Sequence, residues 1–82
     1  MANRSLGLRA PERHPLLTRR QLGILKCLQV GMRPAQVAET LHLAMATVRM
    51  HIRDLNTRLG THSYFASVTE AQRRGLLGPS ID

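Results

Sequence analysis

The feature that most constrains the fold is an apolar seam within residues 47–60, TVRMHIRDLNTRLG. Its four members stand at i, i+4, i+7 and i+11: Val48, Ile52, Leu55 and Leu59. This spacing is typical of one face of an α-helix. Arg49 and Arg53 fall outside the seam. The segment therefore predicts a helix that packs on one side and presents arginines on the other.

Start and stop signals place a first helix at residues 19–29. Thr18 is a favourable N-cap, and Gln21 three positions later completes a capping-box pattern. Gly31 is suited to the left-handed position after the last turn. The expected buried stripe consists of Leu22, Ile24, Leu25 and Leu28.

Two further helices are expected close together in the sequence. The first spans 34–41, with Pro34 at its first position. The second contains the apolar seam, spans 45–58 and stops at Gly60. The short break between them, residues 42–44, indicates a helix-turn-helix pair.

A fourth helix is expected at 64–74, capped by Ser63 and ended by Gly75. Its apolar residues are predicted to lie inward or at an interface: Phe65, Val68 and Ala71. The fold class that follows is all-α, with four helices in one domain over residues 17–77. Residues 1–16 are expected to form a flexible basic arm, and residues 78–82 a loose tail.

The charge of the chain limits the classes of partner. Twelve Lys and Arg residues oppose five acidic residues, which gives a formal charge of +7, and eleven of the twelve are Arg. Arginine binds phosphate and guanine edges through its planar fork, so a nucleic acid or another polyanion is the expected partner. Aromatic residues make up only 2% of the chain, which argues against a base-stacking platform for RNA.

The remaining functional classes find little support. The sequence shows none of the patterns that would indicate an enzyme: paired carboxylates, a phosphate-binding glycine loop, or a nucleophile with a nearby base. His14, His42, His51 and His62 lack the spacing of a metal site, so no metal or cofactor is expected. Cys27 fits a small buried apolar residue. No apolar run is long enough for a membrane span, and we expect a cytoplasmic protein.

The order of these motifs resembles the DNA-binding domain of the LuxR family of bacterial transcription regulators. The resemblance spans residues 17–77. The matching positions are Leu17, Thr18, Arg20, Gly31, Val37, Ala38, Leu41, Thr47, Val48, His51, Arg58, Leu59 and Gly60. It implies a transcription regulator, associated with the bacterial nucleoid, whose third helix reads the major groove of double-stranded DNA.

The resemblance also implies roles for particular residues. Base contacts fall to Arg49, Met50 and Arg53. Contacts with the DNA backbone fall to Thr47, Arg58, Arg20, Arg33 and Thr57. The fourth helix of the family often forms a two-fold dimer, which implies a homodimer interface of Tyr64, Phe65, Val68 and Leu76.

The chain departs from the family pattern at several capping positions. Ala44 stands where a Ser usually caps the third helix, and Arg33 stands where a Ser or Thr often caps the second. Met45 and Ala46 replace a frequent Pro and a polar residue, and Gln21 replaces Glu. We expect either a regulator that consists of this module alone or a fragment of a longer one.

A second hypothesis belongs to a different class. A small module with altered DNA-contact positions could bind a larger LuxR-type regulator through its fourth helix and inhibit it. The end of the chain is rich in apolar residues that could form such a surface: Tyr64, Phe65, Leu76 and Leu77. The same residues fit a homodimer, so the sequence leaves both hypotheses open.

Overall fold

The computed structural model describes residues 16–78. The predicted arm and tail therefore lie almost entirely outside the described residues. The described part contains four α-helices and no strand: α2 (Arg19–Gln29), α3 (Pro34–Leu41), α4 (Met45–Leu59) and α5 (Tyr64–Arg73). This arrangement confirms the all-α fold class.

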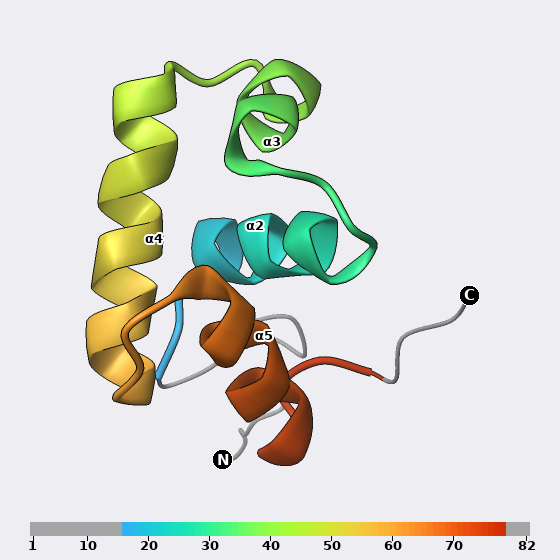
Figure 1. Ribbon diagram of the computed structural model, residues 1–82, viewed down its shortest axis with the longest axis vertical. Coiled ribbons are helices and arrows are strands. Elements are labelled where there is room, and N and C mark those ends of the chain that lie inside the picture. The colour runs from blue at the N-terminus through green and yellow to red at the C-terminus, as the bar shows by residue number, and fades with distance from the viewer. Residues whose placement is uncertain (1–15, 79–82) are drawn as a thin grey trace, which may run out of the picture.

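The four helices are organised around α2 (Figure 1). In that view α4 stands upright along one side, and α2 crosses beside it near the middle of its length. The shorter helices α3 and α5 lie on opposite sides of α2. Accordingly α2 contacts all three other helices, while α4 contacts both α3 and α5. The longest helix is thus supported along one side by the rest of the domain.

The core is aliphatic and receives residues from every helix. The seam that the sequence predicted in α4 supplies Val48 and Leu55, both fully buried, and Leu59. Ile52, the fourth member of the seam, is partly buried and packs against this core. The other buried apolar residues are Leu17, Leu22, Ile24, Leu25, Leu28, Val37, Ala38, Ala71 and Leu77. Burial of one face of α4 fixes which of its side chains face solvent.

Two helix starts carry the side-chain caps that the sequence predicted. Thr18 Oγ1 accepts from the Gln21 backbone N–H at 3.1 Å, and Gln21 Oε1 accepts from the Thr18 backbone N–H at 2.9 Å. This reciprocal pair is the capping box. Ser63 Oγ accepts from the Ala66 backbone N–H at 3.0 Å at the start of α5.

The helix ends depend on left-handed backbone at four places, one of which is Gly75, with a φ of 78°, directly after the C-cap of α5. Gly31 and Gly60 have φ values of 101° and 72°, which glycine adopts without steric cost. His42 also has a positive φ, 57°, and is the only described residue other than glycine to do so. The sequence did not predict this conformation of His42. It reverses the chain after α3 and so sets the start of α4.

Three expectations require correction. Helix α4 ends at Leu59 rather than at 58, because Gly60 itself is its left-handed C-cap. Helix α5 ends at Arg73 rather than at 74, since Arg74 is its C-cap. Leu77 was expected to add to the apolar surface at the end of the chain, but it is buried in the core with 5% exposure. After α5 the chain returns to the core, and the helical periodicity of the sequence did not predict this return.

Candidate nucleic-acid interface

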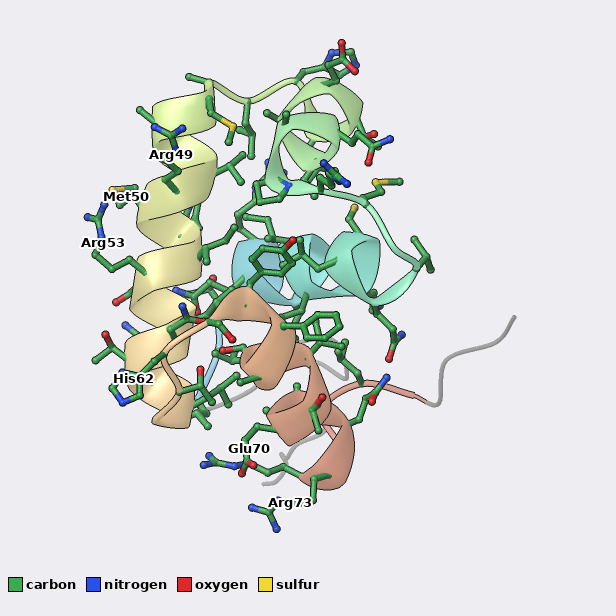
Figure 2. All side chains as sticks on the ribbon, viewed as in Figure 1. Arg49, Met50, Arg53, His62, Glu70 and Arg73 are labelled. Carbon is green, nitrogen blue, oxygen red and sulfur yellow. The ribbon has the colours of Figure 1, made fainter. Side chains whose placement is uncertain are left out.

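The side of α4 opposite the core forms an exposed ridge of Arg49, Met50 and Arg53. All three side chains are exposed, and Figure 2 shows Met50 and Arg53 projecting from α4 away from the bulk of the domain. Met50 is 52% exposed and adds apolar surface to the ridge. Because Val48 and Leu55 are anchored in the core, the ridge is held in a fixed direction.

The two arginines of the ridge are available for a partner. Within residues 16–78, neither the Arg49 nor the Arg53 guanidinium makes a hydrogen bond or an ion pair with another side chain. Other arginines differ in this respect. Arg58, for example, lies 3.3 Å from the carboxylate of Asp54. An unpaired guanidinium keeps all five of its donors for an external acceptor.

The start of α4 lacks a side-chain cap. Ala44 has the extended backbone of an N-cap, but its methyl group accepts no hydrogen bond. The first turn closes through the Ala44 carbonyl, which accepts from the Thr47 and Val48 N–H groups at 3.0 and 3.1 Å. Thr47 is half-buried at this end. No acidic residue lies in the first turn, so the positive end of the helix dipole is not neutralised locally.

The residues expected to contact the DNA backbone occupy several different elements. Arg20 lies exposed in the first turn of α2, and Arg33 is the exposed residue before α3. Thr57 donates its hydroxyl to the Arg53 carbonyl at 3.1 Å. Arg58 donates to the Leu16 carbonyl at 3.2 Å as well as pairing with Asp54. Arg58 is therefore engaged within the domain, whereas the described residues offer Arg20 no ion pair.

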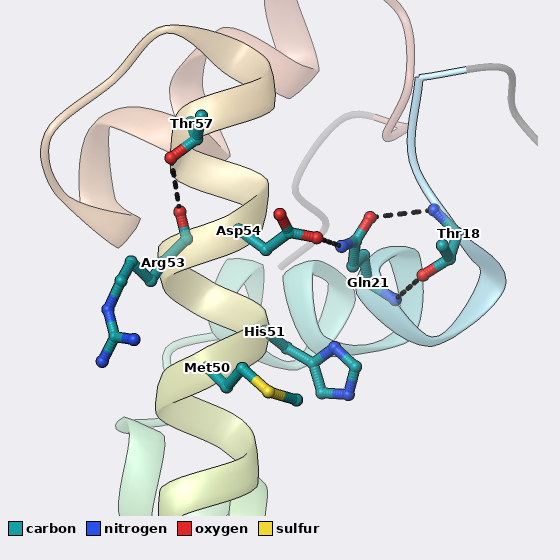
Figure 3. Close-up of a pocket in the computed structure, with 7 residues that line it drawn as sticks. All are labelled: Thr18, Gln21, Met50, His51, Arg53, Asp54 and Thr57. Atoms are coloured by element: carbon teal, nitrogen blue, oxygen red, sulfur yellow. Dashed lines mark hydrogen bonds between the residues drawn. The ribbon is translucent and has the colours of Figure 1, made fainter.

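A groove between α2 and α4 holds a long-range side-chain contact that the sequence did not reveal. Gln21 is 2% exposed, and its amide donates to Asp54 Oδ2 at 2.6 Å. Figure 3 shows Gln21 between the Thr18 backbone and Asp54. The groove is lined by Thr18, Gln21, Met50, His51, Arg53, Asp54 and Thr57. The only carboxylate of α4 is thus directed toward α2 and Arg58 rather than along the ridge.

The predicted dimer residues, in α5 and directly after it, differ in how exposed they are. Phe65 is 79% exposed and is the most exposed large apolar residue described. Tyr64, Val68 and Leu76 are partly buried and pack against the core. Phe65 is thus the clearest candidate for contact with another molecule, and the other three contribute only part of their surface.

A buried polar network fixes α5 to the end of α4. Ser67 is fully buried, and its hydroxyl donates to Asn56 Oδ1. The hydroxyls of Thr61 and Ser67 also lie within hydrogen-bond distance of each other. Because buried polar groups are costly when unpaired, this network favours one arrangement of the two helices. No local pattern in the sequence predicts this network.

A second polar cluster closes the end of α5. The Glu70 carboxylate accepts from Arg73 and from Arg74, and Arg74 also donates to the Leu59 carbonyl at 3.2 Å. Hydrogen bonds from Arg73 and then from Arg74 lower the pKa of Glu70 from 4.5 to about 2. The same pairing raises the pKa of Arg73. These two arginines are therefore partly neutralised within the domain.

Neither a metal site nor a membrane-spanning helix is present in the described part of the chain. Residues 16–78 contain no group of three His, Cys, Asp or Glu side chains that could hold a metal ion. In the same range, no helix has both the length and the hydropathy that a bilayer span requires. Cys27 is half-buried and packs against the core as a small apolar residue.

Comparison with known proteins decides the family. Residues 15–71 match the model for bacterial regulatory proteins of the luxR family. This chain belongs to the LuxR family. The resemblance inferred from the sequence motifs is therefore confirmed, and the matched region includes all of α2, α3 and α4.

Three curated relatives illustrate the similarity of this LuxR-type domain. It is 38% identical over 61 residues to the nitrate/nitrite response regulator protein homolog of Haemophilus influenzae, covering 72% of this chain. It is 34% identical over 61 residues to the HTH-type transcriptional regulator AlkS of Alcanivorax borkumensis, covering 74%. It is 31% identical over 61 residues to the HTH-type transcriptional activator RamA of Corynebacterium glutamicum, also covering 74%.

The aligned region is a small part of each of these relatives. It spans 29%, 7% and 22% of their respective lengths. No solved structure matches the chain significantly. The relatives thus support the assignment of the domain, and they are much longer than the segment that they share with this LuxR-type chain.

Proposed function

We propose that the protein is a sequence-specific DNA-binding transcription regulator that inserts α4 into the major groove. The observation that carries this proposal is the exposed ridge of Arg49, Met50 and Arg53 on a helix anchored from its opposite face. A single α-helix fits the width of the major groove, and arginine binds the O6 and N7 atoms of guanine bidentately. Met50 can contact a thymine methyl group.

The flanking residues are placed to hold the phosphate backbone. Thr47 lies at the start of α4, and Arg20 and Arg33 are exposed on neighbouring elements. Thr57 and Arg58 lie toward its other end. To reach a phosphate, Arg58 must exchange its contacts with the Leu16 carbonyl and Asp54. The formal charge of +7 supports a salt-dependent attraction to DNA.

We also propose that two copies pair through α5. Phe65 offers an exposed ring, and Tyr64, Val68 and Leu76 add partly exposed apolar surface near it. A two-fold dimer of helix-turn-helix domains binds two half-sites related by the same symmetry. The expected operator is therefore pseudo-palindromic. A regulator of this kind acts on the bacterial nucleoid, in the cytoplasm.

A second candidate function also depends on α5 as a contact surface. The domain could bind a larger LuxR-type regulator through α5 and prevent it from acting. The missing cap at Ala44 favours this candidate, because it weakens the start of the helix that would read DNA. Exposed Phe65 serves this candidate as well as the homodimer.

The test is a selection from a random duplex DNA library at about 0.15 M salt, where non-specific binding is reduced. Enrichment of a two-fold-symmetric motif supports a dimeric reader of the major groove. Enrichment of a single half-site supports base reading and contradicts the dimer. Binding without enrichment, or no binding by the folded protein, contradicts the proposal and favours the inhibitor.

A further inference from the structure

A second groove runs along α4 on the side that faces α3 and α5. Its apolar floor consists of Pro34, Met45, Ile52 and Tyr64, and Asn56 also lines it. Arg49 and Arg53 also line this groove, so its edge coincides with the exposed ridge of α4. We name it the α3–α4–α5 groove. Its combination of an apolar floor with two cations is unlike the α2–α4 groove, which contains Asp54.

The electrostatics of the α3–α4–α5 groove favour an anion. No acidic residue lines it. Pro34, Met45 and Tyr64 are the first residues of α3, α4 and α5, so the positive ends of three helix dipoles meet there. None of these helices carries an acidic residue in its first turn. The two arginines, which are unpaired within residues 16–78, add two full positive charges.

The shape and the apolar floor of the groove indicate which class of anionic ligand fits it. Small-molecule sites usually enclose most of their ligand, whereas this groove is open along α4. A phosphate backbone offers no apolar group to cover Met45, Ile52 and Tyr64. An amphipathic helix in a groove provides both an apolar face and charged residues at its margin.

We propose that the α3–α4–α5 groove binds an acidic amphipathic segment of a partner protein. Apolar side chains of the segment rest on Met45, Ile52 and Tyr64, and its carboxylates pair with Arg49 and Arg53. Arginine and carboxylate form short, charge-assisted hydrogen bonds in such pairs. When a segment occupies the groove, the guanidinium groups of Arg49 and Arg53 are paired with it and are not available to contact DNA. The binding step is independent of the proposed function, and only this competition rests on it.

The probe is a synthetic helical peptide of about four turns with Leu on one face and Glu on the other. The control peptide has Lys in place of every Glu. Titration of the full chain, followed by backbone amide NMR shifts, should show binding of the Glu peptide with shifts at Met45, Ile52 and Tyr64. Equal binding of the Lys peptide, or no binding at about 1 mM peptide, would overturn the proposal.

Two variants separate the groove from general charge attraction. Arg49→Glu, at an exposed position, should weaken binding of the Glu peptide about tenfold or more. Met45→Ser should weaken it as well, with helix content checked by circular dichroism. Lys26→Glu, which reverses an exposed cation on α2, is the matched control and should leave binding nearly unchanged. Equal weakening by Lys26→Glu and Arg49→Glu would show attraction by net charge and refute the groove.

Competition is measured separately, with an operator from the duplex selection. Displacement of that DNA by the Glu peptide supports a shared use of Arg49 and Arg53. If the peptide binds the groove and leaves the DNA in place, the groove proposal stands and the assignment of these arginines to DNA bases fails. If no duplex is selected at all, the peptide titration still decides whether the groove binds an acidic segment.

Discussion

The side-chain amide of Gln21 donates a hydrogen bond to Asp54 Oδ2 at 2.6 Å and so joins α2 to α4 across 33 positions of sequence. Gln21 is almost fully buried, and its carbonyl oxygen also completes the capping box of α2. One side chain therefore caps one helix and fixes its position against the helix that presents the arginine ridge.

The first prediction tests the direction of this hydrogen bond. Gln21→Glu keeps the acceptor for the Thr18 N–H but replaces the donor to Asp54 with a second carboxylate. Loss of a hydrogen bond to a charged group should lower the free energy of unfolding by about 1–3 kcal/mol at neutral pH. Chemical denaturation measures the change.

The matched control is the double variant Gln21→Glu with Asp54→Asn. The amide of the new residue at 54 can donate to the carboxylate at 21, so stability should be recovered in large part, less the lost pair between Asp54 and Arg58. If the single variant is as stable as the parent, the contact contributes nothing to the packing of α2 on α4.

A second prediction concerns the uncapped start of α4. Ala44 already has the extended backbone of an N-cap, with φ −66° and ψ 147°. Ala44→Ser should therefore supply the missing acceptor and raise the free energy of unfolding by about 1 kcal/mol. The control is Ala46→Ser, at an exposed position inside the first turn, which should be neutral or slightly destabilising. Equal effects of the two substitutions would argue against a capping deficit at Ala44.

The third prediction tests the buried network between α4 and α5. Ser67→Ala removes the hydroxyl that donates to Asn56, and it leaves the half-buried Asn56 and Thr61 with one hydrogen-bond partner fewer each. It should lower the free energy of unfolding by about 1–3 kcal/mol. Thr69→Ala, an exposed hydroxyl of the same helix, is the control and should change little. A Ser67→Ala variant that unfolds at the same denaturant concentration as the parent would contradict the role of the network.

The fourth prediction is a pH dependence at the end of α5. The pKa of Glu70 is lowered to about 2 by Arg73 and Arg74, from an ordinary value of 4.5. A carboxylate with a lowered pKa stabilises the fold above its unfolded pKa and loses this effect as the pH falls through its folded value. The parent should therefore be more stable than Glu70→Gln at neutral pH, and the difference should shrink as the pH falls from 4.5 toward 2.

Thermal unfolding midpoints across this pH range provide the measurement. Added salt should reduce the difference at neutral pH, because the groups are near the surface. A difference between parent and Glu70→Gln that stays constant with pH and salt would show that packing, rather than charge, explains the substitution.

Local patterns in the sequence sufficed to predict the helices and the family. Thr18, Ser63 and Gly60 act within one turn of their own position, so short-range spacing reveals their roles. The exposure of Arg49 and Arg53 followed from the helical period of the seam. These features depend on residues that are neighbours in the chain.

Contacts between distant segments were not predictable in the same way. The pairing of Gln21 with Asp54 depends on how α2 crosses α4, which no periodic pattern encodes. The burial of Leu77 depends on the chain returning to the core after α5. Histidine adopts the left-handed conformation of His42 more often than most residues do, but too rarely for the residue type alone to predict it. Tertiary packing decides each of these three cases.

The last prediction tests the ridge of α4 against DNA. Arg49→Ala and Arg53→Ala should each weaken binding to the selected operator by about 1–3 kcal/mol and relax the preference at one base position. The reason is that each guanidinium is unpaired in the described part of the chain and can bind a guanine edge bidentately. Lys26→Ala, on the exposed side of α2, is the matched loss of one positive charge.

Binding isotherms on the operator and on a scrambled duplex separate the possible outcomes. Loss of affinity for the operator alone supports base contacts by Arg49 and Arg53. Equal loss on both duplexes, with a smaller salt dependence, would place the two arginines on phosphates instead. If neither variant differs from Lys26→Ala, the positive charge of the chain attracts DNA without α4 reading it, and α4 does not lie in the major groove.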